Sequence, residues 1–264
     1  MKKNENKKAC LSLLLFLLLS SSLLTGCTLV RFDDPVESQQ QTQEIEKQTT
    51  VEYPDAAAAL AADRLVMDER LTDDTGRVLA VYQAAFPWFT AGSSQALQNI
   101  NAHYENEFSY LAEDQARFFE LVRQKPSDTV RTAIFTYELL EAPEGYIAVL
   151  RRYESVDTLD ISTVTYYCEV FSAATGLQLR FSNLFGNQSA AAMEALRSAL
   201  ADWCAQREYD TGWAEALSDD VLTENITLDQ ETLYVGLPAG AAPGGETLAE
   251  LPVEPFLDLL GGGE

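Results

Sequence analysis

The stretch that decides the fold is residues 129–156, which read TVRTAIFTYELLEAPEGYIAVLRRYESV. Its two halves, 129–140 and 146–156, are rich in Val, Ile, Thr, Tyr and Phe, the residue types that favour β-strands. Between them lies Ala-Pro-Glu-Gly at 142–145, a combination typical of turns. Two strands joined by a short turn pair in the antiparallel direction, so this stretch predicts a β-hairpin.

Further strands are expected on both sides of this hairpin. On its N-terminal side, Asp-Asp-Thr-Gly at 73–76 joins two strand-like runs, which indicates another hairpin. On its C-terminal side, a Thr-Gly turn at 175–176 follows a run rich in Thr, Val, Tyr and Phe. The strands expected outside the first hairpin are 64–71, 77–86, 161–172, 177–181, 226–228 and 233–237.

Helical periodicity separates these groups of strands. Apolar residues recur at spacings of three, four or seven along 97–121, which predicts one amphipathic helix with Ser93 or Ser94 as its N-cap. A second helix is expected over 189–207 and a short C-terminal helix over 252–260. Hairpins interrupted by helices predict an α+β fold: a mainly antiparallel sheet with two longer helices and a short C-terminal helix.

The N-terminus has the features of an exported lipoprotein. Four lysines in the first eight residues precede an apolar run over 11–24, which is the order found in signal peptides. The run is 14 residues long and contains four serines, whereas a spanning helix needs about 20 predominantly apolar residues. Leu24-Thr25-Gly26-Cys27 resembles a bacterial lipobox, in which the cysteine receives a diacylglyceryl group and the chain is cut just before it.

The lipobox resemblance and the polar composition after it divide the chain into three parts. Residues 1–26 are the expected signal peptide, 27–63 the lipid anchor and polar tether, and 64–264 a single extracytoplasmic α+β domain. The protein would then be held outside the cytoplasmic membrane through the lipid on Cys27, because two acyl chains are enough for stable anchoring.

The chain is strongly acidic, with 18 Lys and Arg against 41 Asp and Glu. Removal of the signal peptide takes away four lysines and Glu5, which leaves 14 basic and 40 acidic residues and a net charge of −26. This charge argues against nucleic acid and anionic lipid head groups as partners, because both need Lys and Arg. It favours a basic partner, and the solubility of an exported protein is the alternative explanation.

Two cysteines remain after Cys10 leaves with the signal peptide and Cys27 receives lipid. Cys168 falls in a strand-like run and Cys204 in a helical one, so a disulfide between them is one candidate arrangement in an oxidising compartment. Two buried thiols are the alternative, because free cysteine behaves as a small apolar side chain.

Sequence motifs for catalysis or cofactor binding are not found. His103 is the one histidine, and its place near the edge of the apolar face of the first helix favours a structural or solvent-exposed role. H-E-x-x-H, G-x-S-x-G and phosphate-binding glycine loops are absent from the sequence. Adjacent acidic residues are interpreted as solvated surface, because neighbouring residues in a strand point to opposite faces. We therefore predict no catalytic residue, no metal site and no cofactor.

Trp88, Phe89 and Trp213 are the candidate ligand-binding residues. Trp88 and Phe89 follow Pro87, and Trp213 follows Gly212. Exposed aromatic rings at such positions would suit sugar rings or a protein partner. Packing in the core is the alternative interpretation.

Four segments resemble one protein family. VLAVYQAAFPWF (78–89) is similar to a family strand that ends in Tyr-Pro, and LQNINAHYENEF (97–108) is similar to the helix after it. VFSAATGLQLRFSNLF (170–185) is similar to a strand, a Thr-Gly turn and an Asp-Leu-Phe motif, with Asn183 in place of Asp. Residues 226–260 resemble the closing strand pair, loop and helix. The family is the extracytoplasmic domain of unknown function found in RsiV-type anti-sigma factors, which are lysozyme receptors, and ahead of PdaC-type peptidoglycan deacetylases.

The resemblance implies a membrane-anchored binding or sensing module whose ligand is a lysozyme-like muramidase or a cell-wall glycan. A cell-envelope enzyme or accessory subunit that acts on peptidoglycan is the alternative. The sequence departs from the family at 154–163, ESVDTLDIST, where many members carry Gly-Gly-Ala-His. A change at that place alters the surface available for binding.

The lipobox leads to a direct test of anchoring. Cys27→Ala removes the thiol that would receive the diacylglyceryl group, so the variant should take up no lipid label and should leave the membrane fraction. Metabolic labelling with a fatty acid, membrane fractionation and sensitivity of processing to globomycin measure these effects. Unchanged lipid labelling of the Cys27→Ala variant would contradict the prediction.

Overall fold

The structure is a computed structural model that describes residues 52–61, 64–157 and 159–261. The predicted signal peptide and the lipobox residues Leu24, Thr25, Gly26 and Cys27 lie outside the described residues. A compact unit extends from Thr50 to Glu264. Among the residues that the structure describes, no helix is both long enough and apolar enough to cross a membrane.

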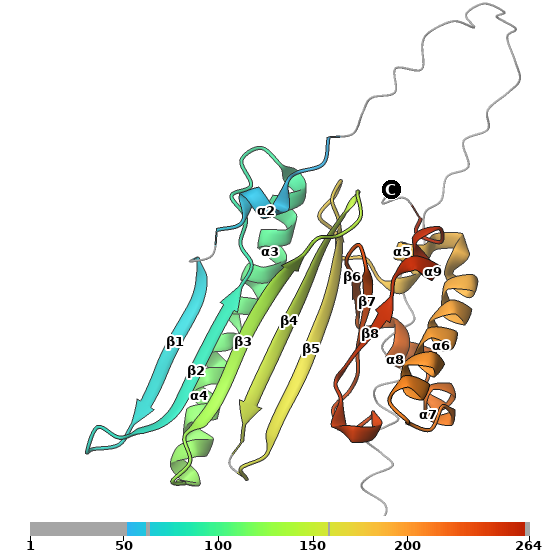
Figure 1. Ribbon diagram of the computed structural model, residues 1–264. Coiled ribbons are helices and arrows are strands. Elements are labelled where there is room, and N and C mark those ends of the chain that lie inside the picture. Colours follow the sequence, from blue (N-terminus) through green and yellow to red (C-terminus); the bar gives the residue numbers. More distant parts are fainter. Residues whose placement is uncertain (1–51, 62–63, 158, 262–264) are drawn as a thin grey trace, which may run out of the picture. The chain divides into compact units, whose positions relative to one another are not determined.

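A five-stranded sheet forms the larger part of this unit (Figure 1). The strands lie in chain order, and all neighbours are antiparallel except β2 and β3, which are parallel. A parallel connection needs a crossover, and the helices between β2 and β3 supply it. This confirms the predicted α+β fold with a mainly antiparallel sheet. The strands are β1 Leu65–Thr72, β2 Val78–Phe86, β3 Arg131–Leu140, β4 Tyr146–Val156 and β5 Ser162–Ser172.

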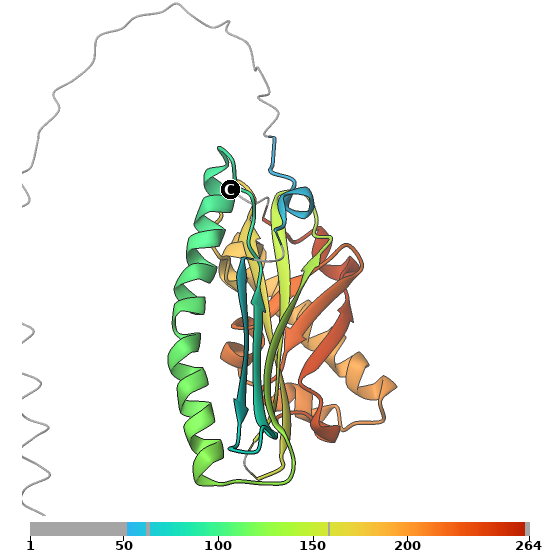
Figure 2. The same ribbon diagram turned by 90° about the vertical axis from the view of Figure 1, so that its left-hand side faces the viewer.

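Two helices cover one face of the large sheet, and Figure 2 shows them stacked end to end along it. They are α3 Gln95–Ser109 and α4 Leu111–Gln124, where the sequence predicts one helix. Tyr110 alone separates them, so the predicted periodicity continues across the break. The side chain of Ser94 accepts a hydrogen bond from the Leu97 N–H at 3.3 Å, which confirms one of the two expected N-caps.

The C-terminal part forms a second, three-stranded antiparallel sheet in the order β6-β7-β8, with helices packed on it. Its longest helix is α6 Ser189–Gln206, close to the predicted 189–207. The other elements are β6 Ile226–Leu228, β7 Thr232–Gly236, β8 Leu248–Pro252, α5 Phe181–Phe185, α7 Gly212–Ala216, α8 Asp219–Thr223, α9 Glu254–Leu257 and the short 3₁₀ turns Gly186–Gln188 and Pro243–Gly245.

One local prediction in this part is wrong, and another holds with different bounds. The expected strand 177–181 makes only one bridge, between Gln178 and Phe171, and Phe181 begins helix α5, which buries Phe181, Leu184 and Phe185 on one side. The expected short C-terminal helix is present as α9 and confirms that prediction, but it is shorter than 252–260, since Pro252 belongs to β8 and pairs with β7. In both segments, packing against the rest of the chain overrides the local pattern.

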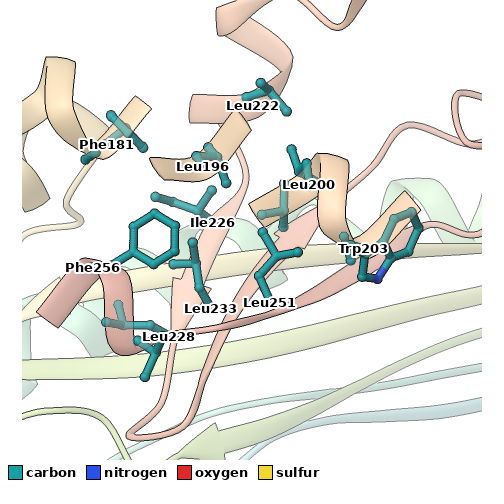
Figure 3. Packing of buried hydrophobic residues seen from close by; sticks show 14 of the residues in the cluster. Phe181, Leu196, Leu200, Trp203, Leu222, Ile226, Leu228, Leu233, Leu251 and Phe256 are labelled. Carbon is teal, nitrogen blue, oxygen red and sulfur yellow. The ribbon is translucent and has the colours of Figure 1, made fainter. Parts of the chain in front are cut away.

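Three hydrophobic clusters hold the layers together. One lies between the large sheet and α3–α4, and a second lies between the small sheet and α6. Figure 3 shows the second, in which Leu196, Leu200 and Trp203 of α6 face the small-sheet residues Leu233 and Leu251. A third, small cluster includes Leu140, Ala148, Leu150 and Cys168 of the large sheet and contacts Tyr234 and Leu248 of the small sheet.

The two cysteines belong to different clusters, so the candidate disulfide is not formed. Cys168 lies in the cluster between the sheets, whereas Cys204 lies between α6 and the small sheet. Both are free and buried. The arrangement is therefore the alternative expected from the sequence, two buried thiols, and burial raises the pKa of each.

Side chains join the large sheet to the small one. The Asn225 amide accepts a hydrogen bond from the Cys168 N–H at 2.6 Å and donates one to the Tyr166 carbonyl at 2.8 Å. The Thr227 hydroxyl of β6 donates to the Glu169 carbonyl at 2.8 Å. Side chains thus bond the backbone groups at the edge of β5 where β6 approaches it. These hydrogen bonds fix the position of the small sheet.

Residues 52–61, in the expected tether, pack on the larger sheet and its helices. Helix α2, Ala56–Ala59, is capped by the Asp55 side chain, and Leu60 forms a β-bridge with Phe89. Tyr53 and Leu60 pack against the cluster beneath α3 and α4. The apolar residues in this part of the expected tether 27–63 therefore contribute to the core beneath α3 and α4.

The turn at Gly176 leads to a stability prediction. Gly176 has φ +70°, and a Cβ there would lie 2.0 Å from the carbonyl oxygen of Ala96 at the start of α3. Gly176→Ala should therefore lower the free energy of unfolding by about 3 kcal/mol, through backbone strain and overlap together. Gly76 is the matched control: its φ is +85°, but a Cβ would meet nothing within 4 Å.

Gly76→Ala should cost only the backbone strain, about 1 kcal/mol. Urea denaturation followed by circular dichroism compares the two variants. Equal costs at the two positions would show that the contact between Gly176 and Ala96 does not constrain the fold.

Candidate functional site

The three candidate aromatic residues do not form a common binding surface. Phe89 is fully buried, and both its N–H and its carbonyl bond to the Asn101 amide at 2.8 Å, so it is a core residue and cannot present its ring to a ligand. Trp88 is half-buried, with the Arg64 guanidinium 4.2 Å from its ring centre. Trp213 lies in the cluster of the small sheet, where its indole N–H donates to the Ala241 carbonyl.

Trp88 borders a shallow pocket of about 380 Å³ together with Arg64 and Glu105. Trp213, by contrast, lies against Trp203 with ring centres 6.3 Å apart. Phe89 contributes to the same pocket, but its buried ring leaves Trp88 as the partly exposed aromatic residue there. The alternative of core packing holds for Phe89 and, in large part, for Trp213.

The one histidine belongs to a partly buried polar cluster, which we call the Glu169 network. Its members are His103, Tyr104 and Glu107 of α3, Arg151 of β4 and Glu169 of β5. Arg151 donates to both carboxylate oxygens of Glu169, at 2.7 and 2.8 Å, and to Glu107 at 2.7 Å. The Tyr104 hydroxyl donates to Glu169 at 2.9 Å, and His103 Nε2 lies 3.4 Å from an oxygen of each glutamate.

Secondary structure brings these residues together. His103 and Glu107 are four residues apart on α3 and so lie on the same side of the helix. On the sheet, Glu169 is opposite Val149 and Arg151 is opposite Tyr167, so Glu169 and Arg151 are diagonal neighbours on the face below α3. The alternation of side chains along β4 and β5 therefore directs both charges into the interface between helix and sheet.

The Arg151–Glu169 pair at the centre of the network is buried, whereas the Glu107 side chain is 37% exposed. Glu169 is 4% exposed and Arg151 is 6% exposed. The Arg151 guanidinium also lies 4.7 Å from the ring centre of Phe86 and 5.2 Å from that of Tyr167, which are cation–π distances. Arg151 is thus held by two carboxylates and by aromatic rings, and an unpaired buried charge is avoided.

Electrostatics within the network follow from these contacts. Burial alone would raise the pKa of Glu169, but the hydrogen bond to His103 and the charge and hydrogen bonds of Arg151 outweigh it, so the pKa of Glu169 lies below its ordinary value of 4.5. Burial and the neighbouring Glu169 carboxylate raise the pKa of Tyr104 well above its ordinary value. The network therefore holds an ionised Glu169 and a neutral Tyr104 at neutral pH.

Metal binding is the other chemistry that this residue set suggests. One ligand atom from each of His103, Glu107 and Glu169 lies within 4.8 Å of the others. Both carboxylates, however, already share the Arg151 guanidinium, and a cation between them would face that positive charge. The donor set thus acts as a closed ion-pair network and fits a metal poorly.

Sequence reasoning missed this network because its charged partners are far apart in the chain. A signal exists in the strand TVTYYCEVFS (163–172), where Glu169 stands between Cys168 and Val170 in a buried run. A carboxylate at such a position needs a partner. The partner itself, Arg151, becomes evident only from the strand register.

A groove lies between α6 and the outer strand of the small sheet, and we call it the α6–β8 groove. Its volume is about 600 Å³. Ala195, Ala199 and Trp203 of α6 and Leu251 of β8 give it an apolar lining. Three acidic residues, Asp202, Glu231 and Glu250, line it as well, and none of its lining residues in the described part of the chain is Lys or Arg.

The Glu169 network makes a testable contribution to stability. Glu169→Gln leaves Arg151 buried without its full charge partner and should lower the free energy of unfolding by about 3 kcal/mol at pH 7. Glu154→Gln is the matched control: Glu154 bonds Arg152 at 2.7 Å on the same strand, but both side chains are more than one-third exposed. It should cost less than about 1 kcal/mol.

The same variants predict a pH dependence. Because the pKa of Glu169 is lowered in the folded state, its stabilising effect is full above the unfolded pKa and is lost as pH falls through the folded pKa. The difference between wild type and Glu169→Gln should therefore shrink between about pH 6 and pH 3 in urea titrations. A difference that stayed constant or grew toward acid pH would contradict the assigned ionised state.

Comparison with known proteins gives a likeness in fold. No protein-family model and no curated protein matches the chain. The crystal structure of a DUF3298 family protein from Pseudomonas aeruginosa PAO1 has a TM-score of 0.54 and 13% identity, over 76% of this chain and 94% of that chain. A member of the same family from Bacteroides fragilis NCTC 9343 has a TM-score of 0.51 and 15% identity, over 78% and 95%. The chain thus has the fold of two bacterial proteins of a family named as a domain of unknown function.

Proposed function

We propose that this protein is an extracytoplasmic binding or sensing lipoprotein, anchored through Cys27, that recognises a basic protein. The observation that carries the proposal is the α6–β8 groove, whose lining combines apolar side chains with three acidic residues. Its charge has the same sign as the mature chain, whose net charge is −26. A groove of this kind is complementary to a cationic surface with some apolar contact.

The Glu169 network supports binding over catalysis. An envelope hydrolase that cleaves glycans needs two carboxylates flanking the scissile bond, one of them free to give up or take a proton. Glu107 and Glu169 are close enough, but both are bonded to Arg151, and Glu169 is 4% exposed. The alternative of an enzyme or accessory subunit acting on peptidoglycan has no comparable observation in its favour.

The proposed partner class is a lysozyme-like muramidase. The resemblance to the extracellular domain of lysozyme receptors motivates this choice, and the acidic charge fits a cationic protein. A wall glycan is less well supported, because sugar rings favour aromatic platforms and Trp88 and Trp213 belong to different clusters. The negative field of the chain would accelerate encounter with a cationic protein.

Salt dependence of binding tests this function. The Debye length is about 30 Å at 0.01 M salt and about 8 Å at 0.15 M, so the association rate of the full chain with hen-type lysozyme should fall by about tenfold or more over this range. The dissociation rate should change less. Surface plasmon resonance with the purified full chain in detergent measures both rates.

Cytochrome c is the control for charge alone. It should bind more weakly than lysozyme at every salt concentration if recognition includes shape and apolar contact. Failure to bind lysozyme even at low salt would reject the muramidase proposal. Equal binding of both proteins would reduce the interaction to nonspecific attraction.

A further inference from the structure

The outer edge of β8 is an open strand edge in the described part of the chain. β8 pairs with β7, opposite Leu233 and Val235, and among the described residues no strand pairs with its other side. The Val253 N–H bonds the Glu231 carbonyl at 3.0 Å, and the Leu237 N–H bonds the Thr247 carbonyl at 2.9 Å. The backbone N–H and carbonyl groups of Thr247, Val253 and every second residue between them therefore point toward β7.

The alternate residues, Leu248 and Glu250, consequently direct their backbone N–H and carbonyl groups away from β7, toward the open edge. Pro252 follows at the end of the strand and offers a carbonyl but no N–H. The edge thus presents one short row of donors and acceptors that an added strand could pair with.

The α6–β8 groove meets this edge at Glu250 and Pro252. Helix α6 lies alongside the small sheet (Figure 1). Figure 3 shows Trp203 of α6 on the same side as Leu251 of β8, where the helix and the sheet meet. On β8, Leu251 is buried toward α6, whereas Glu250 points to the opposite side of the strand and is exposed. A strand in the groove would therefore meet apolar atoms on one side and a carboxylate on the other.

We propose that an extended, basic segment of a protein partner binds in the α6–β8 groove by adding a strand to the open edge of β8. The inference rests on the proposed function and names the site and the mode of recognition. Alternate apolar side chains of the segment lie against Ala195, Ala199 and Trp203. Its Lys or Arg side chains lie toward Glu250, with Asp202 and Glu231 adding to the attraction. Strand addition of this kind obtains affinity from backbone hydrogen bonds and specificity from alternate side chains.

Charge decides between this partner and other occupants. A second copy of the chain would place two Glu250 carboxylates against each other, and charged residues and proline on an edge strand oppose such self-pairing. Residues 28–51 of the chain itself carry five acidic and two basic residues, the same sign as the groove. A groove of about 600 Å³ has the size of an ordinary ligand site and suits a short segment.

The probe is a fluorescein-labelled heptapeptide of alternating Lys and Val, measured by fluorescence anisotropy with the purified full chain in detergent. Two analogues carry N-methyl groups, one on two Val amides and the other on two Lys amides. In an added strand only one of these sets faces β8. One analogue should therefore bind about tenfold more weakly than the parent, while the other binds within about threefold of it.

Variants of the groove locate the site. Asp202→Lys, Glu231→Lys and Glu250→Lys, combined in one variant, should weaken peptide binding by about tenfold or more at 0.15 M salt. The matched control combines Glu69→Lys, Glu113→Lys and Glu144→Lys, which are exposed, lie on β1, α4 and the β3–β4 turn, and change the net charge equally. Because these positions lie outside the groove, the control should lose less than about threefold.

Glu250→Pro removes the outward N–H and should also weaken binding by about tenfold, whereas Glu250→Gln, which keeps the N–H, should lose less. Thermal melting by circular dichroism checks that each variant folds. Should Glu250→Pro fail to fold, the two N-methylated peptides still decide the question, because they leave the protein unchanged.

Two results would overturn the inference: equal binding of the two N-methylated analogues, or equal loss in the two triple-lysine variants. Its failure differs from failure of the proposed function. If lysozyme binds the wild-type chain and the groove variant equally well, the α6–β8 groove is not the binding site, but the proposed binding function still holds. If the peptide binds as expected and lysozyme does not bind, the site stands and the muramidase proposal fails.

Discussion

The position of Glu169 connects the layers of this fold. Its carboxylate bonds Arg151 on the neighbouring strand and Tyr104 on helix α3, while its carbonyl accepts the Thr227 hydroxyl from the small sheet. One residue of β5 thus ties the sheet to the helix on one face and to the second sheet at its edge. A buried charge must be paired, so the helix, the two strands and their register have to be correct together.

Other polar side chains do similar work at the ends of the elements. Asn101 bonds the N–H and the carbonyl of Phe89, and Asn225 bonds the Cys168 N–H and the Tyr166 carbonyl at the edge of β5. Each side-chain amide thus takes the place of a peptide group on a neighbouring strand. β5 is closed by side chains in this way, whereas β8 keeps an open edge beside an acidic groove. The surface that we propose for binding therefore lies at an edge of the small sheet that no other strand pairs with in 52–61, 64–157 or 159–261.

Local patterns predicted the hairpins and the long helices correctly. Ser94 and the periodicity after it define the start of α3, and the Ala-Pro-Glu-Gly turn joins β3 to β4 as expected. The predictions failed where packing against a neighbouring element selects the secondary structure. Phe181 begins a helix instead of ending a strand, and Leu248–Pro252 pairs as a strand although Pro252 was expected to begin a helix. Apolar residues in such short segments fit either structure, and the neighbouring element selects one.

The sequence by itself determined the acidic charge, the lipobox resemblance at Cys27 and the α+β order of strands and helices, because composition and periodicity are local properties. Only the tertiary structure decided that Phe89 is buried, that Cys168 and Cys204 lie in different clusters, and that His103 joins Arg151 and Glu169. These outcomes depend on strand register and on how α3 and α6 pack on the two sheets. Strand register and helix packing are set by contacts between residues far apart in the chain, and no local sequence pattern contains these contacts.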